Sequence, residues 1–152
     1  MRKNPRLAVE TTITLPCACA NLRRAARTVT QFYDDILRPS GMRVTQFTLL
    51  QALTLAPRIS QKELARLLEI DSTTLTRTLA HLRRKGWLSS VPGSDRRELR
   101  LSLTAAGHRE YKRVFPYWDS AQKDLRRALG KTTWDQIIDA SVRTAELAAK
   151  SS

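Results

Sequence analysis

The sequence predicts a mainly α-helical fold with one small β-hairpin, and two patterns of residues support this. Over most of the 152 residues, apolar side chains recur at three- and four-residue intervals, which is the helical period. Glu98–Leu103 instead alternates apolar and polar residues, as a half-buried strand does. The turn residues Pro92-Gly93-Ser94-Asp95 separate it from Trp87–Val91, so these two segments are predicted to pair. A chain of this length can bury one proper core, and we expect a single domain over residues 1–152.

A helix-turn-helix is predicted before the hairpin. Ser60 and Glu63 have the spacing of a capping box, in which a hydroxyl and a carboxylate satisfy the first free amides of a helix. The break at Ile70-Asp71-Ser72 provides Asp71 or Ser72 as the cap of a second helix that runs to about Lys85. Two helices joined by so short a break are typical of the helix-turn-helix. The first of them has three leucines on one side: Leu64, Leu67 and Leu68.

The second helix has one apolar face and one polar, basic face. At about 100° per residue, Leu75, Leu79 and Leu82 point into a core. On the opposite face, hydroxyls permit close approach to a DNA groove and Arg77 has the geometry to bind a guanine. An ordinary polar surface helix is the alternative interpretation. The side chains predicted to contact DNA from this helix are Ser72, Thr73, Thr74, Thr76, Arg77, His81 and Arg84.

Basic residues also lie near the predicted hairpin tip. Packing in a core does not explain two arginines, Arg96 and Arg97, at a hairpin tip. A basic tip beside a basic helix suits a wing that reaches into the adjacent minor groove. Asp95 is predicted to orient Arg97 rather than to contact DNA. The hairpin and the helix-turn-helix together predict a winged helix-turn-helix over about residues 45–103.

The charge of the chain favours a polyanionic partner. Lys and Arg number 27 against 14 Asp and Glu, which gives a formal net charge of +13. Between Arg77 and Arg113, ten basic residues face three acidic ones, a net of +7 (ten minus three). More than half of the excess therefore lies in about a quarter of the chain, which indicates a basic patch.

Helices are predicted on both sides of the winged unit. The first spans about residues 17–37 and ends at Pro39-Ser40-Gly41, and another spans about residues 45–56. Thr104 caps a long helix to about Leu129, which Pro116 should bend, and a last helix follows Gly130. Residues 17–38 and 104–149 have apolar stripes beyond what the winged unit needs, so we expect them to form a homodimer interface. Packing within one chain only is the alternative.

Other classes of protein receive little support. Two histidines, five glycines and no clustered carboxylates give no catalytic constellation and no phosphate-binding loop, so we expect neither an enzyme nor a cofactor. No metal site is predicted, because Cys17-x-Cys19 provides at most two soft ligands. No apolar run is long enough to span a bilayer, and the first sixteen residues lack the apolar core of a signal peptide. We therefore expect a cytoplasmic protein without a membrane partner, whose thiols are reduced.

The segments DRRELRLSLTAAG (Asp95–Gly107) and STTLTRTLAHLRRKGWL (Ser72–Leu88) resemble the MarR family of winged-helix regulators. The resemblance covers about Cys17–Ala149. It implies a dimeric, sequence-specific regulator of transcription, a repressor that binds a pseudo-palindromic operator in double-stranded DNA and is released by a small molecule or an oxidant. The alternative is a winged-helix module that binds protein or RNA without operator recognition.

The resemblance also implies an effector site. In members that sense organic hydroperoxides, the reactive cysteine corresponds to Cys19, with Cys17 nearby, and a tyrosine that holds the thiolate corresponds to Tyr33. Their second tyrosine corresponds to Val44, so this pattern is incomplete, and two structural thiols at a dimer seam are the alternative. Other members bind aromatic acids between the dimer helices and the winged unit. The residues predicted for such a pocket, which also suit a core, are Arg24, Phe32, Tyr117 and Trp118.

Overall fold

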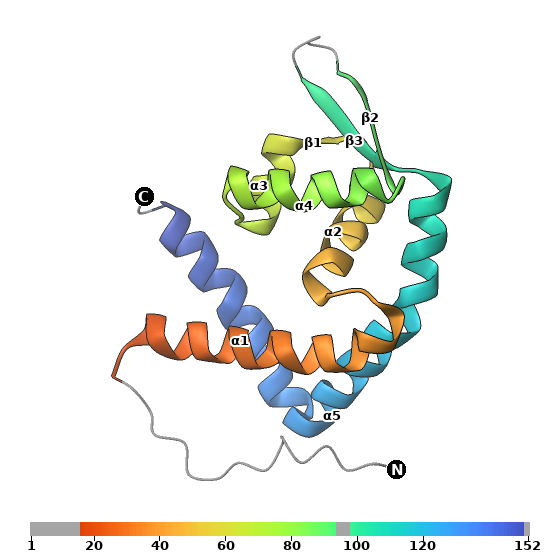
Figure 1. The fold of residues 1–152 in the computed structure, drawn as a ribbon. Helices are drawn as coiled ribbons and strands as arrows, with labels where there is room; N and C mark the ends of the chain where they lie inside the picture. Colours follow the sequence, from red (N-terminus) through yellow and green to blue (C-terminus); the bar gives the residue numbers. More distant parts are fainter. Residues whose placement is uncertain (1–15, 94–97, 151–152) are drawn as a thin grey trace.

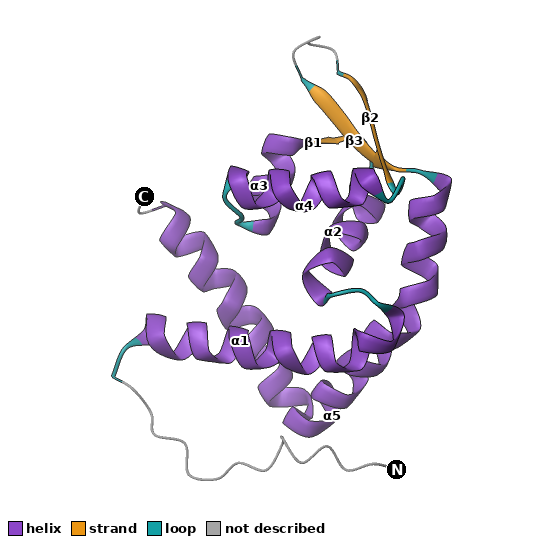
Figure 2. Cartoon of the chain, in the orientation of Figure 1, coloured by secondary structure: helices purple, strands orange, loops and turns teal. Residues whose placement is uncertain are grey.

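The computed structural model describes residues 16–93 and 98–150, and it confirms a mainly helical fold with one small sheet (Figures 1 and 2). Figure 2 shows the hairpin strands projecting beyond the helices of the winged unit. The elements in chain order are α1 (Ala18–Leu37), the 3-10 turn η2 (Arg38–Ser40), α2 (Val44–Leu55), β1 (Ile59–Ser60), α3 (Gln61–Leu68), α4 (Ser72–Arg84), β2 (Leu88–Pro92), β3 (Leu99–Leu103) and α5 (Ala105–Lys150).

The sheet is antiparallel, with the strand order β1-β3-β2. In the β2–β3 hairpin, Leu88 pairs with Leu103 at the base and Pro92 pairs with Leu99 at the outer end. The short strand β1 adds to the other edge of β3, where Ile59 pairs with Leu101.

The core of the winged unit lies between α2, α3, α4, the sheet and the first part of α5 (Figure 1). Leu64 of α3 and Leu101 of β3 are fully buried in it. The three leucines that the helical period places on the inner face of α4 are buried as well, so that prediction is confirmed: Leu75, Leu79 and Leu82.

Two leucines that the patterns place inside are exposed instead. Leu67 is 57% exposed, because α3 has only eight residues and contacts the core through Leu64 and Leu68, which turns Leu67 away. Leu99 is 48% exposed, because it pairs with Pro92 at the outer end of the hairpin, beyond the core. The burial that each pattern predicts is therefore found only for the residues nearest the core.

The long helix α5 begins and breaks near the predicted positions. The Thr104 hydroxyl accepts a hydrogen bond from the Gly107 amide at 3.0 Å and so caps the first turn. The backbone leaves the helical region at Gly130, where φ is 76° and ψ is 162°. At Pro116 the backbone stays in the helical region, because the fixed φ of proline suits a helix even though its ring removes one hydrogen bond.

The helices α1 and α5 cross below the winged unit (Figure 1). Their crossing is fixed by buried Tyr33, whose hydroxyl donates a hydrogen bond to Gln122 Oε1. Beyond the crossing, both helices leave large apolar side chains exposed in the single chain. These are Leu22 and Val29 on α1, and Ile137, Ile138, Val142 and Leu147 on α5.

Candidate nucleic-acid interface

The helix-turn-helix is held by caps at each of its joints. Ser60 Oγ accepts from the Glu63 amide at 3.2 Å, and Glu63 Oε2 accepts from the Ser60 amide at 2.8 Å. At the other end of α3, Glu69 adopts a left-handed conformation with φ of 48°. Asp71 Oδ1 then accepts from the Thr74 amide at 2.9 Å and begins α4. Both predicted caps are thereby confirmed, and they fix α4 relative to α3.

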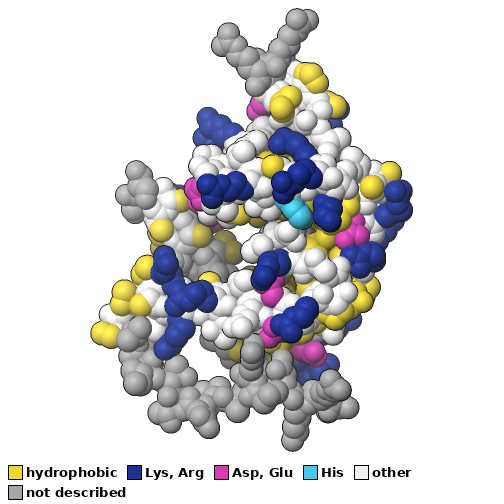
Figure 3. Space-filling model, in the orientation of Figure 1, with side chains coloured by type: hydrophobic (Ala, Val, Ile, Leu, Met, Phe, Trp, Pro, Cys, Tyr) yellow, Lys and Arg dark blue, Asp and Glu magenta, His cyan; other side chains and the backbone are white. Residues whose placement is uncertain are grey.

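The outer face of α4 is open to solvent. Thr73, Arg77, Ala80 and Arg84 are exposed on the side opposite the buried leucines. Among the described residues, Arg77 and Arg84 have neither an ion-pair partner nor a hydrogen-bonded side chain. Figure 3 shows Lys and Arg side chains gathered over this face of the winged unit, where Asp and Glu are sparse. The arrangement provides uncompensated positive charge on one side of a rigid helix.

The predicted hydroxyl-bearing residues of α4 have different surroundings. Thr76 Oγ1 donates to the Ser72 carbonyl at 2.7 Å and accepts from Gln61 Nε2 at 2.8 Å, so it joins α4 to α3. The Thr74 carbonyl accepts from the Thr78 hydroxyl, within the helix. The side chains of Ser72, Thr73 and Thr74 are exposed at the start of the helix. We therefore expect Thr76 to position the helix as much as to contact a ligand.

His81 lies at the edge of the predicted face rather than on it. Its side chain is half-buried, and its ring contacts the ring of Trp87 edge-on at a centroid distance of 6.5 Å. Trp87 in turn packs against the core. A histidine in this place links the end of α4 to the base of the hairpin.

The predicted wing contacts Asp95, Arg96 and Arg97 lie outside the described residues. The described part of the hairpin carries Arg100, which the sequence analysis did not select. The alternation of residues in β3 predicts which face of the strand Arg100 lies on, but not its partners. Glu63, one of these partners, lies 37 residues before it in the sequence.

The candidate redox residues are not brought together within one chain. Cys17 and Cys19 are exposed free thiols at the start of α1. Tyr33 lies 14 residues beyond Cys19 on the same helix, roughly 21 Å away at about 1.5 Å per residue. Burial raises the pKa of the Tyr33 hydroxyl, which is bonded to Gln122. Within one chain, Tyr33 therefore serves the contact between α1 and α5.

The four residues predicted for a ligand pocket are also dispersed. Trp118 stacks on Phe47 at 5.6 Å, and Tyr117 packs against the core of the winged unit. Phe32 contacts Tyr33 edge-on at 5.8 Å, whereas Arg24 lies two turns earlier on α1 and bonds to Asn21.

An open groove of about 700 Å³ lies elsewhere, between the second half of α1 and the segment before α2, and none of these four residues lines it. The ion pair of Asp34 with Arg43, at 3.0 Å, joins α1 to that segment. Asp34 also accepts the Val44 amide at 2.7 Å and thus caps α2 from another helix. Asp34 and Arg43 were not selected by the sequence analysis either.

Within residues 16–93 and 98–150, no group of three or more His, Cys, Asp or Glu side chains is placed to hold a metal ion. Among the helices that the structure describes, none is both long and apolar enough to cross a membrane.

A capped helix-turn-helix followed by an antiparallel hairpin defines a winged-helix protein with a basic recognition surface. A family model described as MarR family matches residues 40–98. The chain is 35% identical to the transcriptional regulator MosR of M. tuberculosis, solved in complex with DNA, with a TM-score of 0.78 over 88% of this chain and 97% of that one. The chain therefore belongs to the MarR family of DNA-binding transcriptional regulators.

Curated relatives agree with this assignment. The uncharacterized HTH-type transcriptional regulator YwoH of Bacillus subtilis is 28% identical over 93 residues, which cover 61% of this chain and 68% of YwoH. The multiple antibiotic resistance protein MarR of Salmonella typhimurium is 35% identical over 75 residues. That match covers 49% of this chain and about half, 52%, of the MarR protein. The description of YwoH as an HTH-type transcriptional regulator agrees with the helix-turn-helix that the sequence predicts.

Proposed function

We propose that this protein is a cytoplasmic repressor that binds a pseudo-palindromic operator in double-stranded DNA as a homodimer. The observation that carries the proposal is the outer face of α4, where Arg77 and Arg84 are exposed and have no counter-ion among the described residues. A guanidinium left free in this way is available to a guanine edge or to phosphates. The similarity to MosR, which has been solved with DNA, supports the same use of this surface.

A homodimer provides the second half of the recognition surface. Two α4 helices related by a two-fold axis bind successive major grooves when they lie about one helical turn apart, roughly 34 Å. The exposed apolar side chains of α1 and α5 supply a surface on which a second copy can pack. The hairpin then lies at the outer edge of each half-site, beside the minor groove.

We propose that an oxidant releases the protein from DNA, and two exposed free thiols support this. Cys17 and Cys19 are free and exposed in the same turn region at the start of α1. Oxidation of Cys19 to a sulfenic acid by a hydroperoxide, which is reduced to the alcohol, permits a disulfide with a second thiol and loss of water. A bridge to the partner subunit's Cys17 would displace α1 at the dimer interface and move the two α4 helices out of register.

A competition gel shift tests the proposal. The full chain is titrated onto its own upstream DNA, with and without a large excess of random duplex. Retention of a discrete complex in the presence of the competitor is the expected result. If the excess of random duplex abolishes the complex with the upstream DNA completely, operator recognition is excluded and a module that binds protein or RNA is favoured.

A further inference from the structure

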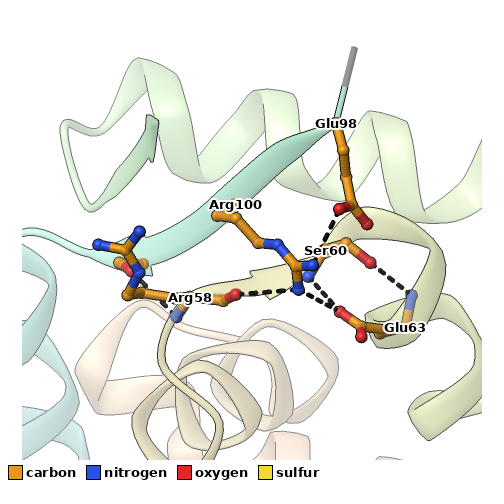
Figure 4. A network of polar contacts seen from close by, with 6 residues as sticks. Arg58, Ser60, Glu63, Glu98 and Arg100 are labelled. Carbon is orange, nitrogen blue, oxygen red and sulfur yellow. Dashed lines mark hydrogen bonds and ion pairs between the residues drawn. The ribbon is translucent and has the colours of Figure 1, made fainter. Parts of the chain in front are cut away.

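The polar face of β3 holds the beginning of α3 through one arginine (Figure 4). Arg100 Nη1 donates to Glu63 Oε2 at 2.8 Å, and Arg100 Nη2 donates to Glu98 Oε2 at 2.9 Å. Its side chain is 27% exposed, which is low for an arginine on the outer face of a hairpin. The guanidinium is thus bound by two carboxylates, one on α3 and one on the residue just before β3.

Glu63 also belongs to the capping box of α3. The oxygen that accepts from Arg100 is the same Oε2 that accepts from the Ser60 amide. Ser60 is 2% exposed and pairs with Arg100 in the sheet. The hairpin and the first turn of α3 therefore share one carboxylate, so a displacement of either one disturbs the other.

The turn before β1 is held by the same face of β3. Arg58 has a φ of 63°, a left-handed conformation that residues other than glycine adopt at a cost. Its amide donates to Ser102 Oγ at 3.2 Å, and its carbonyl accepts from Arg100 Nη1 at 3.5 Å. Arg100 and Ser102 alternate with buried Leu101, so the outward face of the strand fixes the entry to the helix-turn-helix.

We propose that Arg100 is a positioning residue that sets the angle of the β2–β3 hairpin relative to α3 and α4, and so holds the wing and the recognition helix in one register for DNA. The inference rests on the proposed function, because it assigns Arg100 a part in binding without a contact to DNA. A planar guanidinium is required, since it reaches Glu63, Glu98 and the Arg58 carbonyl at once, whereas an ammonium cannot.

A distance measurement tests the positioning directly. Spin labels are attached at Ser90→Cys on β2 and Lys62→Cys on α3, in a chain that also carries Cys17→Ser and Cys19→Ser. We expect a narrow distance distribution with Arg100 intact and a broader one in Arg100→Gln, Arg100→Lys and Glu63→Gln. Arg66→Gln, an exposed arginine of α3 with no ion pair among the described residues, is the control and should stay narrow. An equally narrow distribution in Arg100→Gln would overturn the proposal.

A binding cycle on operator DNA tests the consequence. Arg100→Gln, Arg100→Lys and Glu63→Gln should each raise Kd by about fivefold, and the double variant Arg100→Gln/Glu63→Gln should be no worse than either single one. Wild-type affinity of Arg100→Lys, or additive losses, would mean that the charge acts on DNA directly and would overturn the proposal. A lower Tm with unchanged Kd would overturn it as well, because Arg100 would then serve stability alone.

The two experiments separate this inference from the proposed function. Should the unsubstituted chain fail to select its operator over random DNA, the proposed function is wrong. The spin-label distances still decide whether Arg100 positions the hairpin, since that measurement needs no DNA.

Discussion

Arg77 stands in the middle of the exposed face of α4, on the side opposite Leu75 and Leu79. Arg77→Ala should weaken binding to the cognate site by about 1–3 kcal/mol and relax the base preference at the position it contacts. Fluorescence anisotropy with the cognate site and with single-base variants measures both effects. Arg126→Ala, which removes an exposed arginine of α5, is the control and should bind as the unsubstituted chain does. Equal affinity of Arg77→Ala and the control would mean that α4 is not the recognition helix.

Cys19 is the thiol that the family resemblance assigns to sensing. In a DNA-binding titration with cumene hydroperoxide, Cys19→Ser should remain bound while the unsubstituted chain dissociates, because no sulfenic acid forms at the sensing position. Cys17→Ser should respond more slowly, since it removes the resolving thiol. Thiol mass spectrometry identifies the oxidised residue. If the unsubstituted chain stays bound with both thiols oxidised, the redox mechanism is wrong and the cysteines are structural.

Two carboxylates of the helix-turn-helix make folding sensitive to acid. Hydrogen bonds from Ser60, and in addition Arg100, lower the pKa of Glu63, and hydrogen bonds from Thr74 lower the pKa of Asp71. Each carboxylate therefore stabilises the fold above its ordinary pKa, and this contribution is lost as the pH falls through the lowered value in the folded state. The Tm should drop as the pH falls below the ordinary pKa values of these carboxylates and through their lowered values, and Glu63→Gln and Asp71→Asn should each flatten that drop. A profile unchanged in both variants would contradict the assignment.

At the scale of helices and strands, local signals allowed most of the fold to be predicted. The caps at Ser60 and Asp71 could be predicted because each joins residues three apart in the sequence. The helix-turn-helix, the hairpin and the break at Gly130 likewise follow from residues that are close in the sequence. Leu67 and Leu99 could not be placed correctly, because periodicity gives a face but not how far the core extends along it. The pairing of Arg100 with Glu63 needs the register of the sheet, which the sequence pattern does not contain.

Gly107 joins two elements by close approach rather than by backbone conformation. A Cβ at this position would lie 2.2 Å from the Trp87 carbonyl oxygen, which accepts the Thr104 amide. Since backbone cannot move aside cheaply, Gly107→Ala should separate the start of α5 from the base of the hairpin. We expect a loss of about 2 kcal/mol in unfolding free energy and a Tm lower by roughly 4–8 °C. Thermal unfolding of His108→Ala, the exposed neighbour, is the control, and equal Tm values would refute the packing argument.

At the scale of the whole molecule, the exposed basic face of α4 could be predicted from the sequence, whereas the residues grouped as an effector site lie apart in one chain. The residues of α4 are neighbours on one helix, so their shared face follows from the helical period. Cys19 and Tyr33 were grouped by resemblance, and the structure of one chain places them at different ends of α1. Any site that joins them must therefore include a second chain, which makes the state of assembly decisive.

The apolar end of α5 supports a dimer. Ile138 is 49% and Val142 54% exposed, and one turn apart on the same side of the helix they form an apolar surface that a second copy would cover. Light scattering at micromolar concentration should give the mass of two chains of 17.3 kDa each. Ile138→Asp should shift that mass to one chain, because a carboxylate buried in an apolar interface loses its hydration.

The control Gln136→Asp places the same charge about 200° away on the helix and should remain dimeric. Deletion of residues 133–152 should give an aggregated or weakly binding monomer. The apolar side chains of α1 would then be exposed to solvent, and no dimer would hold the two DNA-binding units together. On operator DNA, Ile138→Asp should lose the discrete complex of two half-sites while binding a single half-site as before, since α4 itself is unchanged. A full-length chain that scatters as a stable monomer and still binds the complete operator would refute the dimer and, with it, any sensing mechanism that needs the partner's thiol.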